Sequence, residues 1–451
     1  ILNTVNTVRF ERLFPDGGRF EERTRREGLH LWYYAKYDPS VPTSEMASLL
    51  SSCKDIEIIE YSLAAETSDH RRAASPAAGA QSVTRAIADE VRNVPFPFNE
   101  SERSQQMQWH YNNTGNIFAQ TSQLGADANV YAAWQLSTGN PDVIVAVVDQ
   151  GVKYDHEDLA ANMWVNEAEL NGTPGVDDDG NGYVDDIYGY NFTKETGELD
   201  FSAELMHGTH VAGTIAAVNN NGVGVCGIAG GSGRGDGVKI MSCQIFAGNA
   251  GGNYMSSVKA IKYAADNGAV ILQCSWGYTS GTANSYEWGT PGYADEEQWE
   301  TLAPLEKDAL DYFTHNAGSP NGPIDGGIAV FASGHEYANS AGFPGAASMC
   351  VSVAATAADF TPATYTNYGP GTKISAPGGD RDYYWDYGEG ALRGEAGCVF
   401  STLPYNVSET GFGYMEGTSM ACPHVSGVAA LGLSYALEKG KKFTLDEFKT
   451  C

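Results

Sequence analysis

Short apolar runs alternate with amphipathic stretches along the chain from about residue 130 onward. The short runs have no polar alternation, which is typical of parallel strands that are covered on both faces. Alternating strands and helices predict an α/β fold in three layers, a mostly parallel sheet flanked by helices. We expect strands at Val143–Val148, Val238–Cys243, Val270–Ser275, Ile328–Ser333 and Val351–Thr356. We expect helices at Tyr131–Ser137, His207–Asn219, Tyr254–Asn267 and Thr418–Glu438.

The beginning of the chain has a different pattern. Alternating apolar residues predict a strand over Leu29–Tyr37, a helix follows Pro42, and Ile56–Leu63 is predicted to be a second strand. Residues 1–64 are therefore expected to form a small α+β unit. Residues 65–116 are rich in Ala, Ser, Pro, Gln and Asn without a sustained period, so we expect a linker with a helix at Val83–Val91. Residues 117–451 are expected to form the large α/β domain.

Composition excludes several classes of function. The chain has 56 acidic residues against 27 Lys and Arg, a net charge of −29, which argues against a nucleic-acid partner because phosphate contacts need a basic face. No apolar run approaches the roughly 18 residues of a membrane span, so none is expected. The 8 cysteines form no Cys-x-x-Cys pairs. Those in apolar runs are expected to be buried thiols rather than disulfides or zinc ligands: Cys226, Cys243, Cys274 and Cys350.

Three reactive positions follow expected strands or open expected helices. Asp149 follows the first strand, His207 and His210 open an Ala/Gly-rich helix, and Ser419 opens the last helix. Taken singly, they are typical of a capping Asp, a structural His or an i, i+3 pair of metal ligands, and a Ser N-cap. Taken together, the order Asp, His, Ser suits a serine nucleophile that is activated by a base whose tautomer an acid holds. The helix N-terminus at Ser419 also favours a developing oxyanion.

The motifs around these residues closely resemble the three signatures of the subtilisin family of serine proteases. They are Val147–Val152, His207–Gly213 and Gly417–Gly427, within a resemblance that covers Gln105–Leu437. The resemblance implies a subtilisin-like fold, with Asp149 as orienting acid, His207 as general base and Ser419 as nucleophile. His210 and the last motif's His424 would then be structural.

A fourth stretch resembles the family's substrate-binding segment. Ser275, Trp276 and Gly277 match the segment whose backbone pairs with a polypeptide substrate and walls its main specificity pocket. Ser275 and Gly277 are small, which lets a peptide backbone approach. For Trp276, packing in the core is a nearly equal alternative.

One position departs from the family pattern. His335 stands where the family usually has an Asn that donates a hydrogen bond to the oxyanion. A neutral imidazole has one N–H to donate, but its reach and shape differ from those of an amide. Three interpretations follow: a working natural variant, a slow enzyme, or a residue introduced to block self-cleavage. Because the sequence includes a region that an active protease would cut off, the pattern favours impaired turnover.

The N-terminal unit resembles the pro-domain of secreted subtilases, which chaperones folding and then occupies the active site. This predicts a zymogen whose first partner is its own N-terminal unit, with maturation cleavage within Ala64–Met107. It also predicts a secreted or cell-envelope location. An unrelated accessory domain is the alternative interpretation of this unit.

The segment 177–186 is a candidate calcium loop. Asp177, Asp179, Asn181 and the carbonyl of Tyr183 occupy the first four ligand places of an EF-hand loop. Tyr188 stands at the place of the closing Glu, so Asp185 or Asp186 must complete the shell. Carboxylates together with a backbone carbonyl favour calcium over magnesium. A solvated acidic turn without an ion is the alternative.

The family resemblance implies a second calcium site. Asp158 and the loop 219–225 resemble the family's high-affinity calcium loop. Asn221 would supply a side-chain oxygen, and residues 219, 223 and 225 would supply carbonyls. An Asn/Gly turn without an ion is an equally good interpretation.

These observations predict a serine endopeptidase in zymogen form. The alternative is a catalytically silent homologue that binds peptides, which His335 keeps open. A metal-dependent hydrolase using His207 and His210 is a more distant third, since no further ligand is evident near them.

Overall fold

The computed structural model describes residues 8–61, 64–67, 94–115, 122–201, 205–247, 252–318, 322–382 and 394–450. A seven-stranded sheet runs through its centre, and every neighbouring pair of strands is parallel. Its strands, in spatial order, are β13 (Ile374–Pro377), β12 (Val351–Thr356), β11 (Ile328–Ala332), β8 (Ile271–Cys274), β4 (Ile144–Asp149), β6 (Lys239–Gln244) and β5 (Gly189–Asn191). The five expected strands are therefore confirmed, each within one or two residues of its expected ends.

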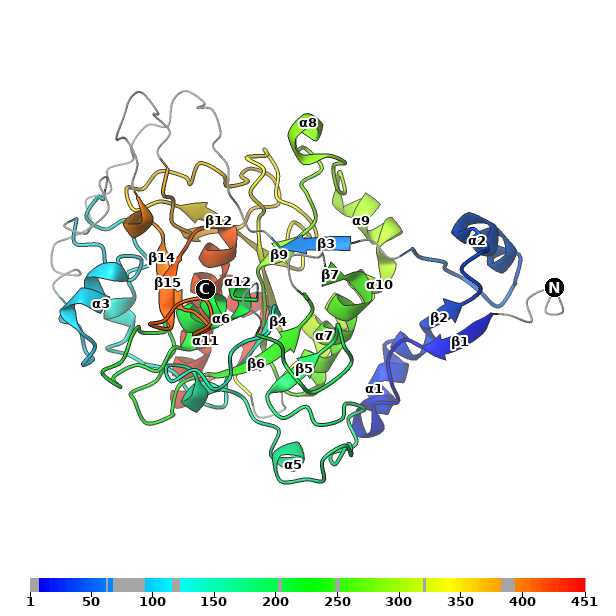
Figure 1. The fold of residues 1–451 in the computed structure, drawn as a ribbon, viewed down its shortest axis with the longest axis horizontal. Helices are drawn as coiled ribbons and strands as arrows, with labels where there is room; N and C mark the ends of the chain where they lie inside the picture. Colours follow the sequence, from blue (N-terminus) through cyan, green and yellow to red (C-terminus); the bar gives the residue numbers. More distant parts are fainter. Residues whose placement is uncertain are drawn as a thin grey trace.

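Helices cover both faces of this sheet, as the α/β pattern predicted (Figure 1). On one face α6 (His207–Ala216) packs along α11 (Thr418–Glu438), and on the other α7 (Tyr254–Asp266) packs along α10 (Pro304–Asn316). Two apolar clusters fill the spaces between these layers. The expected helix near residue 131 is the single turn α4 (Val130–Ala133), and α10 was not expected.

Helix α11 is long and apolar enough to cross a bilayer by those two measures, and 67% of its apolar window is buried inside the protein. Its contacts with α6 and with β8, β11, β12 and β13 account for that composition. The thiols of Cys226, Cys243, Cys274 and Cys350 are free and buried, as predicted.

Shorter elements surround this core. They are α3 (Glu102–Met107), α5 (Glu167–Leu170), α8 (Ser285–Trp288), α9 (Glu296–Leu302), α12 (Leu445–Thr450), the pair β10 (Ile324–Asp325) and β16 (Phe443–Thr444), and the pair β14 (Val399–Thr402) and β15 (Phe412–Met415).

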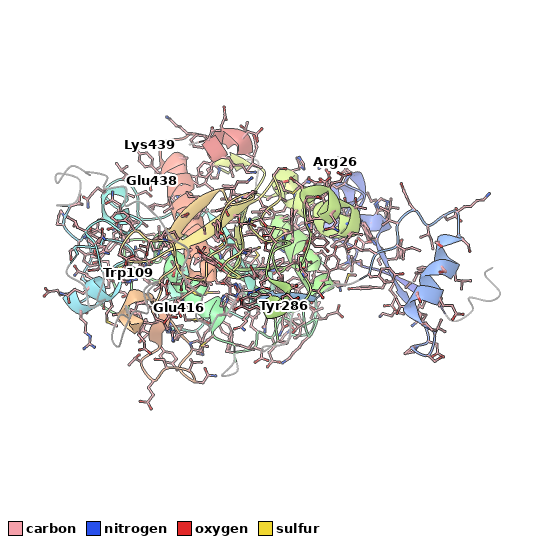
Figure 2. The ribbon with its side chains drawn as sticks, turned by 90° about the horizontal axis from the view of Figure 1, so that it is seen from above. Arg26, Trp109, Tyr286, Glu416, Glu438 and Lys439 are labelled. Atoms are coloured by element: carbon pink, nitrogen blue, oxygen red, sulfur yellow. The ribbon has the colours of Figure 1, made fainter. Side chains whose placement is uncertain are left out.

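The N-terminal unit lies at one side of the molecule, drawn in blue in Figures 1 and 2. It contains β1 (Arg9–Arg12), α1 (Glu21–Arg26), β2 (Tyr33–Lys36) and α2 (Thr43–Ser51), and β1 pairs antiparallel with β2. The strand expected over Leu29–Tyr37 begins later than predicted, because Gly28 at φ 80° starts a 3-10 turn over Leu29–Leu31.

The second strand expected in this unit was misplaced. Residues 56–61 are not in a strand, whereas β3 (Ala64–Thr67) is. This strand does not extend the β1–β2 pair. It lies between β7 (Gly252–Asn253) and β9 (Trp276–Gly277) of the large domain, antiparallel to both. The helix expected at 83–91, and most of the interval proposed for maturation cleavage, lie outside the described residues.

Candidate active site

Asp149 and His207 form a direct hydrogen-bonded pair at the carboxyl end of the sheet. Asp149 is the last residue of β4 and His207 is the first residue of α6, and both side chains are almost fully buried. Nδ1 of His207 lies 2.8 Å from Oδ1 and 2.9 Å from Oδ2 of Asp149. A carboxylate can only accept here, so Nδ1 carries the proton and Nε2 is left as the basic nitrogen of the neutral ring.

Gln150, which sequence reasoning missed, joins this pair a second time. Its side-chain Oε1 accepts the backbone N–H of His207 at 2.9 Å, and its own backbone N–H donates to Oδ1 of Asp149 at 2.6 Å. A Cβ at Gly208 would lie 2.1 Å from the carbonyl oxygen of Gln150, so the helix can begin here only with glycine at that position. The only signal in the sequence was adjacency to Asp149.

Ser419 is the second residue of α11 and lies against the end of β8. Its Oγ donates to the carbonyl of Ser275 at 3.1 Å, and the Oγ of Ser275 donates to the carbonyl of Ser419 at 2.7 Å. Gln273 supports this pair, because its Nε2 donates to the Oγ of Ser275 at 2.7 Å. The start of α11 is thereby fixed to one strand end.

Several contacts bring Ser419 to the same edge of the sheet as Asp149. Strands β4 and β8 are neighbours, with Val147 opposite Gln273, so Asp149 and Ser275 follow that pair by two residues each. The indole of Trp276 donates to the carbonyl of Val148 at 2.8 Å. Burial, with a smaller contribution from Asp149, raises the pKa of the Cys422 thiol, one turn after Ser419, to about 12.

His335 follows β11 at this edge, next to β8 in the sheet. It is 8% exposed, and its ring lies edge-on to that of Trp288, with 6.0 Å between the ring centroids. Asn367, also missed by sequence reasoning, fixes the loop: its Oδ1 accepts from the N–H groups of Glu336 at 3.0 Å and Ala338 at 2.9 Å, and its Nδ2 donates to the carbonyl of Ser333 at 3.0 Å.

The candidate substrate-binding segment is β9 with the residue before it. Its backbone pairs with β3, in the register Glu66 with Gly277 and Thr67 with Trp276. The Trp276 ring is fully buried, 5.2 Å from that of Phe331, so its side chain packs in the core as the alternative interpretation held. A Cβ at Gly277 would lie 3.1 Å from the carbonyl oxygen of Phe343, a tight contact.

The two further histidines of the motifs make hydrogen bonds away from the carboxylate of Asp149. Nε2 of His210 lies 3.1 Å from the carbonyl of Val399, and Nδ1 of His424 lies 2.8 Å from that of Met420. Nε2 of His424 lies 2.8 Å from Nδ1 of His110. Burial lowers the pKa of His210 to about 3 and that of His424 to about 4, so both stay neutral.

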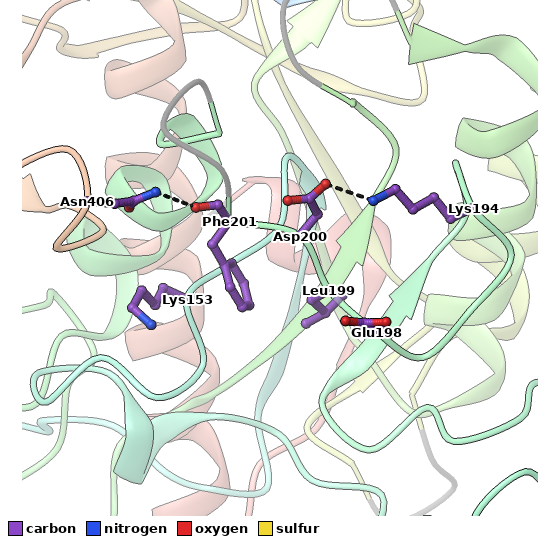
Figure 3. Close-up of a pocket in the computed structure, with 7 residues that line it drawn as sticks. All are labelled: Lys153, Lys194, Glu198, Leu199, Asp200, Phe201 and Asn406. Carbon is purple, nitrogen blue, oxygen red and sulfur yellow. Dashed lines mark hydrogen bonds and ion pairs between the residues drawn. The ribbon is translucent and has the colours of Figure 1, made fainter.

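A cavity of about 450 Å³ borders the turn after Asp149. It is lined by Lys153, Lys194, Glu198, Leu199, Asp200, Phe201 and Asn406 (Figure 3). Lys194 pairs with Asp200 at 2.9 Å, and the Asn406 amide donates to the Phe201 carbonyl at 2.8 Å. With charges of both signs, this cavity is not an apolar specificity pocket.

The acidic loop brings together Asp177, Asp179 and a carboxylate that sequence reasoning missed, Glu169 on α5. One oxygen from each lies within 4.8 Å of the others, an arrangement that fits a hard divalent cation. No signal in the loop itself points to Glu169, because it precedes the loop by eight residues on a separate helix turn. We call Glu169, Asp177 and Asp179 the acidic cluster.

The other expected ligands of this loop have different partners. Asp185 accepts the backbone N–H of Gly175, and Asp186 accepts from Asn166, from Asn181 and, at 2.6 Å, from the hydroxyl of Tyr263. Burial raises the pKa of Asp186 to about 7. The Asn181 side-chain oxygen accepts the N–H of Tyr183 at 2.8 Å. The carboxylate that lies within reach of both Asp177 and Asp179 is that of Glu169, and the closing role of Asp185 or Asp186 stays a prediction.

At the second expected calcium site, Asp158 is buried between the ends of the loop 219–225. Its Oδ1 accepts from Asn221 at 2.7 Å and its Oδ2 from the N–H of Val225 at 2.9 Å. Burial raises the pKa of Asp158 to about 8. Glu100, unexpected from the sequence, accepts the N–H of Asn221 at 3.1 Å, and its buried carboxylate also interacts with the thiol of Cys226. The carboxylates of Asp158 and Glu100 are both buried and close enough to repel each other, a pair that fits a cation at this position.

Comparison with known proteins identifies the family of the chain. The model of the subtilase family matches residues 140–449, so the chain belongs to the subtilase family. It is 30% identical over 306 residues to halolysin of Haloferax mediterranei, which covers 68% of this chain and 44% of halolysin. It is 29% identical over 386 residues to an extracellular protease of Xanthomonas campestris, covering 82% of this chain and 54% of that protein. The chain thus spans about half the length of these relatives.

Among solved structures, the chain is similar to a protease from Pseudoalteromonas arctica. The two are 28% identical with a TM-score of 0.50, and the match covers 78% of this chain and 90% of that one.

Proposed function

We propose that this chain is a serine endopeptidase. The observation that carries the proposal is the Asp149–His207 hydrogen bond, at the edge of the sheet where α11 presents Ser419. The Oγ of Ser419 attacks the carbonyl carbon of a peptide bond as its proton passes to Nε2 of His207, while Asp149 stabilises the imidazolium. The leaving amine takes that proton, and water then hydrolyses the acyl-enzyme by the same route in reverse.

The oxyanion of the tetrahedral intermediate would be held by the backbone N–H of Ser419. The first N–H groups of a helix have no partner within the helix and carry its positive dipole end. The buried ring of His335, at the end of the neighbouring strand β11, is the second candidate donor.

We also propose that the N-terminal unit and the strand that follows it, β3, block the substrate cleft. The pairing of β3 with β7 on one side and β9 on the other supports this, because an extended substrate would need the same backbone groups. Side-chain contacts hold the unit nearby: Arg23 bonds Asp266 and Tyr312, and the Trp32 indole donates to Asp308 at 3.0 Å. The enzyme would then be a zymogen, matured by a cut that releases this unit.

Calcium is the proposed cofactor. The acidic cluster would hold one ion, and Asp158, Glu100 and Asn221 a second. An ion at either place would fix a surface loop and neutralise buried acids, so its contribution is to stability. Relatives named as extracellular proteases support secretion, where calcium is abundant.

Replacing Ser419 by Ala tests the proposal. It should abolish cleavage of a denatured protein, self-processing and labelling by a fluorophosphonate probe, with the fold retained by circular dichroism. Normal hydrolysis by Ser419→Ala would refute the assignment. Failure of the parent chain to label, although it still binds peptides, would favour the alternative of a silent peptide-binding homologue.

A further inference from the structure

The N-terminal unit places a positive charge directly on the acidic cluster. The guanidinium of Arg19 donates to Oδ2 of Asp179 at 3.1 Å, across 160 positions of sequence. The Asp179 side chain is 7% exposed, whereas that of Arg19 is 56% exposed. Arg19 thus reaches in from the surface and covers one of the three carboxylates that would hold the cation.

The backbones of the two segments also fit closely around this ion pair. A Cβ at Gly18, whose φ is +49°, would lie 2.2 Å from the carbonyl oxygen of Gly180. A Cβ at Gly182 would lie 2.9 Å from Cγ of Pro15. The turn 15–19 of the N-terminal unit is therefore seated on the acidic loop itself, with no room for a side chain between them.

Every carboxylate of the cluster already accepts hydrogen bonds from the loop backbone. Glu169 accepts the N–H of Asp178 at 2.6 Å, Asp177 accepts that of Gly182 at 2.8 Å, and Asp179 accepts that of Asn181 at 3.1 Å. Among the residues that the structure describes, Arg19 is the basic residue that forms a salt bridge with the acidic cluster. A divalent ion would meet this fixed positive charge at close range.

We propose that cation binding at the acidic cluster and docking of the N-terminal unit oppose each other. An ion held by Glu169, Asp177 and Asp179 repels the guanidinium of Arg19 and competes with it for Asp179, so it loosens the turn 15–19 from the acidic loop. By linkage, the docked unit weakens cation binding by the same factor. The contacts of Arg23 and Trp32 are separate, so the ion loosens one edge of the unit rather than expelling it outright.

This inference rests on the proposed function in two respects, the cation held by the acidic cluster and the inhibitory role of the N-terminal unit. Calcium would then favour maturation, because it weakens the hold of the unit on the large domain. The coupling between Arg19 and the cation is a binding equilibrium, and it can be measured in a chain that cannot cleave anything.

The test uses the full chain with Ser419→Ala, titrated with calcium by calorimetry. Arg19→Ala should tighten binding at the acidic cluster by about tenfold, the effect of a unit charge about 6 Å from a divalent ion in water. Arg9→Ala is the matched control, since Arg9 belongs to the same unit but pairs with Glu11 and is 81% exposed. Asp179→Asn assigns the binding phase to the cluster, and in that background Arg19→Ala should have little further effect.

Hydrogen exchange on the same protein gives the reciprocal measurement. Saturating calcium should speed amide exchange over residues 13–21 and leave α2 unchanged, and the acceleration should shrink in Arg19→Ala. The proposal is overturned if Arg19→Ala binds calcium no more tightly than Arg9→Ala. It is also overturned if Asp179→Asn binds calcium like the parent. Neither calorimetry nor hydrogen exchange involves catalysis. Both measurements would therefore still test the coupling if the chain proved not to be a protease.

Discussion

Nδ1 of His207 lies 2.8 Å from Oδ1 of Asp149, and Gln150 joins the same two residues a second time through one backbone and one side-chain hydrogen bond. The imidazole is therefore fixed both at its ring and at the backbone of its helix. The orientation of the base therefore depends on the turn that follows β4 as well as on the carboxylate.

Asp149→Asn tests the role of the carboxylate. An amide in this place can donate to Nδ1, which stabilises the tautomer with its proton on Nε2 and removes the basic nitrogen. We expect kcat to fall by about 10⁴-fold with little change in KM, the effect known for such a change in a Ser-His-Asp protease. Steady-state kinetics on a peptide substrate would measure it. A loss below tenfold would argue against Asp149 as the orienting acid.

Gln150→Ala tests the second connection, in which Gln150 acts as a positioning residue. It removes the acceptor for the His207 N–H, so we expect a loss of about 0.5–2 kcal/mol in the free energy of unfolding, as for other helix caps. We also expect kcat to fall while KM stays nearly constant. Gln150→Glu, which keeps an acceptor, should recover much of kcat. The exposed Gln135→Ala is the control, and equal effects of the two alanine variants would contradict the role.

His335→Asn tests the unusual residue at the oxyanion position. The loop is held by Asn367 through the N–H groups of Glu336 and Ala338, so the backbone should survive the change. If His335 is a poor donor, kcat rises. One oxyanion donor is worth roughly 10²–10³ in kcat, a range measured on subtilisin itself. His335→Ala shows whether the imidazole donates to the oxyanion at all. The kcat of this variant falls below that of the parent only if it does. No gain in His335→Asn would contradict the hypothesis of impaired turnover.

The buried histidines predict acid sensitivity. The unfolded chain takes up protons at His210 and His424 below about pH 6.5, whereas burial lowers the folded pKa values to about 3 and about 4. Their stabilising contribution is thus complete above about pH 6.5 and is lost as the pH falls, by up to about 1.4 kcal/mol per pH unit for each histidine. Urea unfolding of Ser419→Ala between pH 4 and 7 would measure this.

A variant isolates one of these groups. His424→Gln should have a lower free energy of unfolding at pH 7. The slope of that free energy against pH should be smaller, because about one proton fewer is taken up on unfolding. His315→Asn is the matched control, because His315 is exposed on α10. An unchanged slope in His424→Gln would mean that other groups control the acid response.

Removal of calcium should lower the melting temperature of Ser419→Ala, and Glu169→Gln should reduce that effect. Glu169 accepts hydrogen bonds from the backbone N–H groups of Asp178 and Asp185. A Gln side chain keeps one acceptor oxygen for them but removes a charge from the acidic cluster. Glu167→Gln, exposed on the same helix α5, is the control. Thermal scans with and without a chelator would decide. A chelator response as large in Glu169→Gln as in Glu167→Gln would contradict a cation at this cluster.

Sequence alone determined the core of this protein because its signals are local. Continuous apolar runs specify buried parallel strands within a few residues, and the motifs at Asp149, His207 and Ser419 lie where those strands end or helices begin. The relations between distant segments came only from the tertiary structure: Glu169 beside Asp177, Asn367 inside the His335 loop, β3 between β7 and β9, and Arg19 on Asp179. In each of these contacts the two partners come from different segments. No shared sequence motif or helical or strand repeat connects one partner to the other. Packing of the whole chain, rather than any local pattern, decides which of them meet.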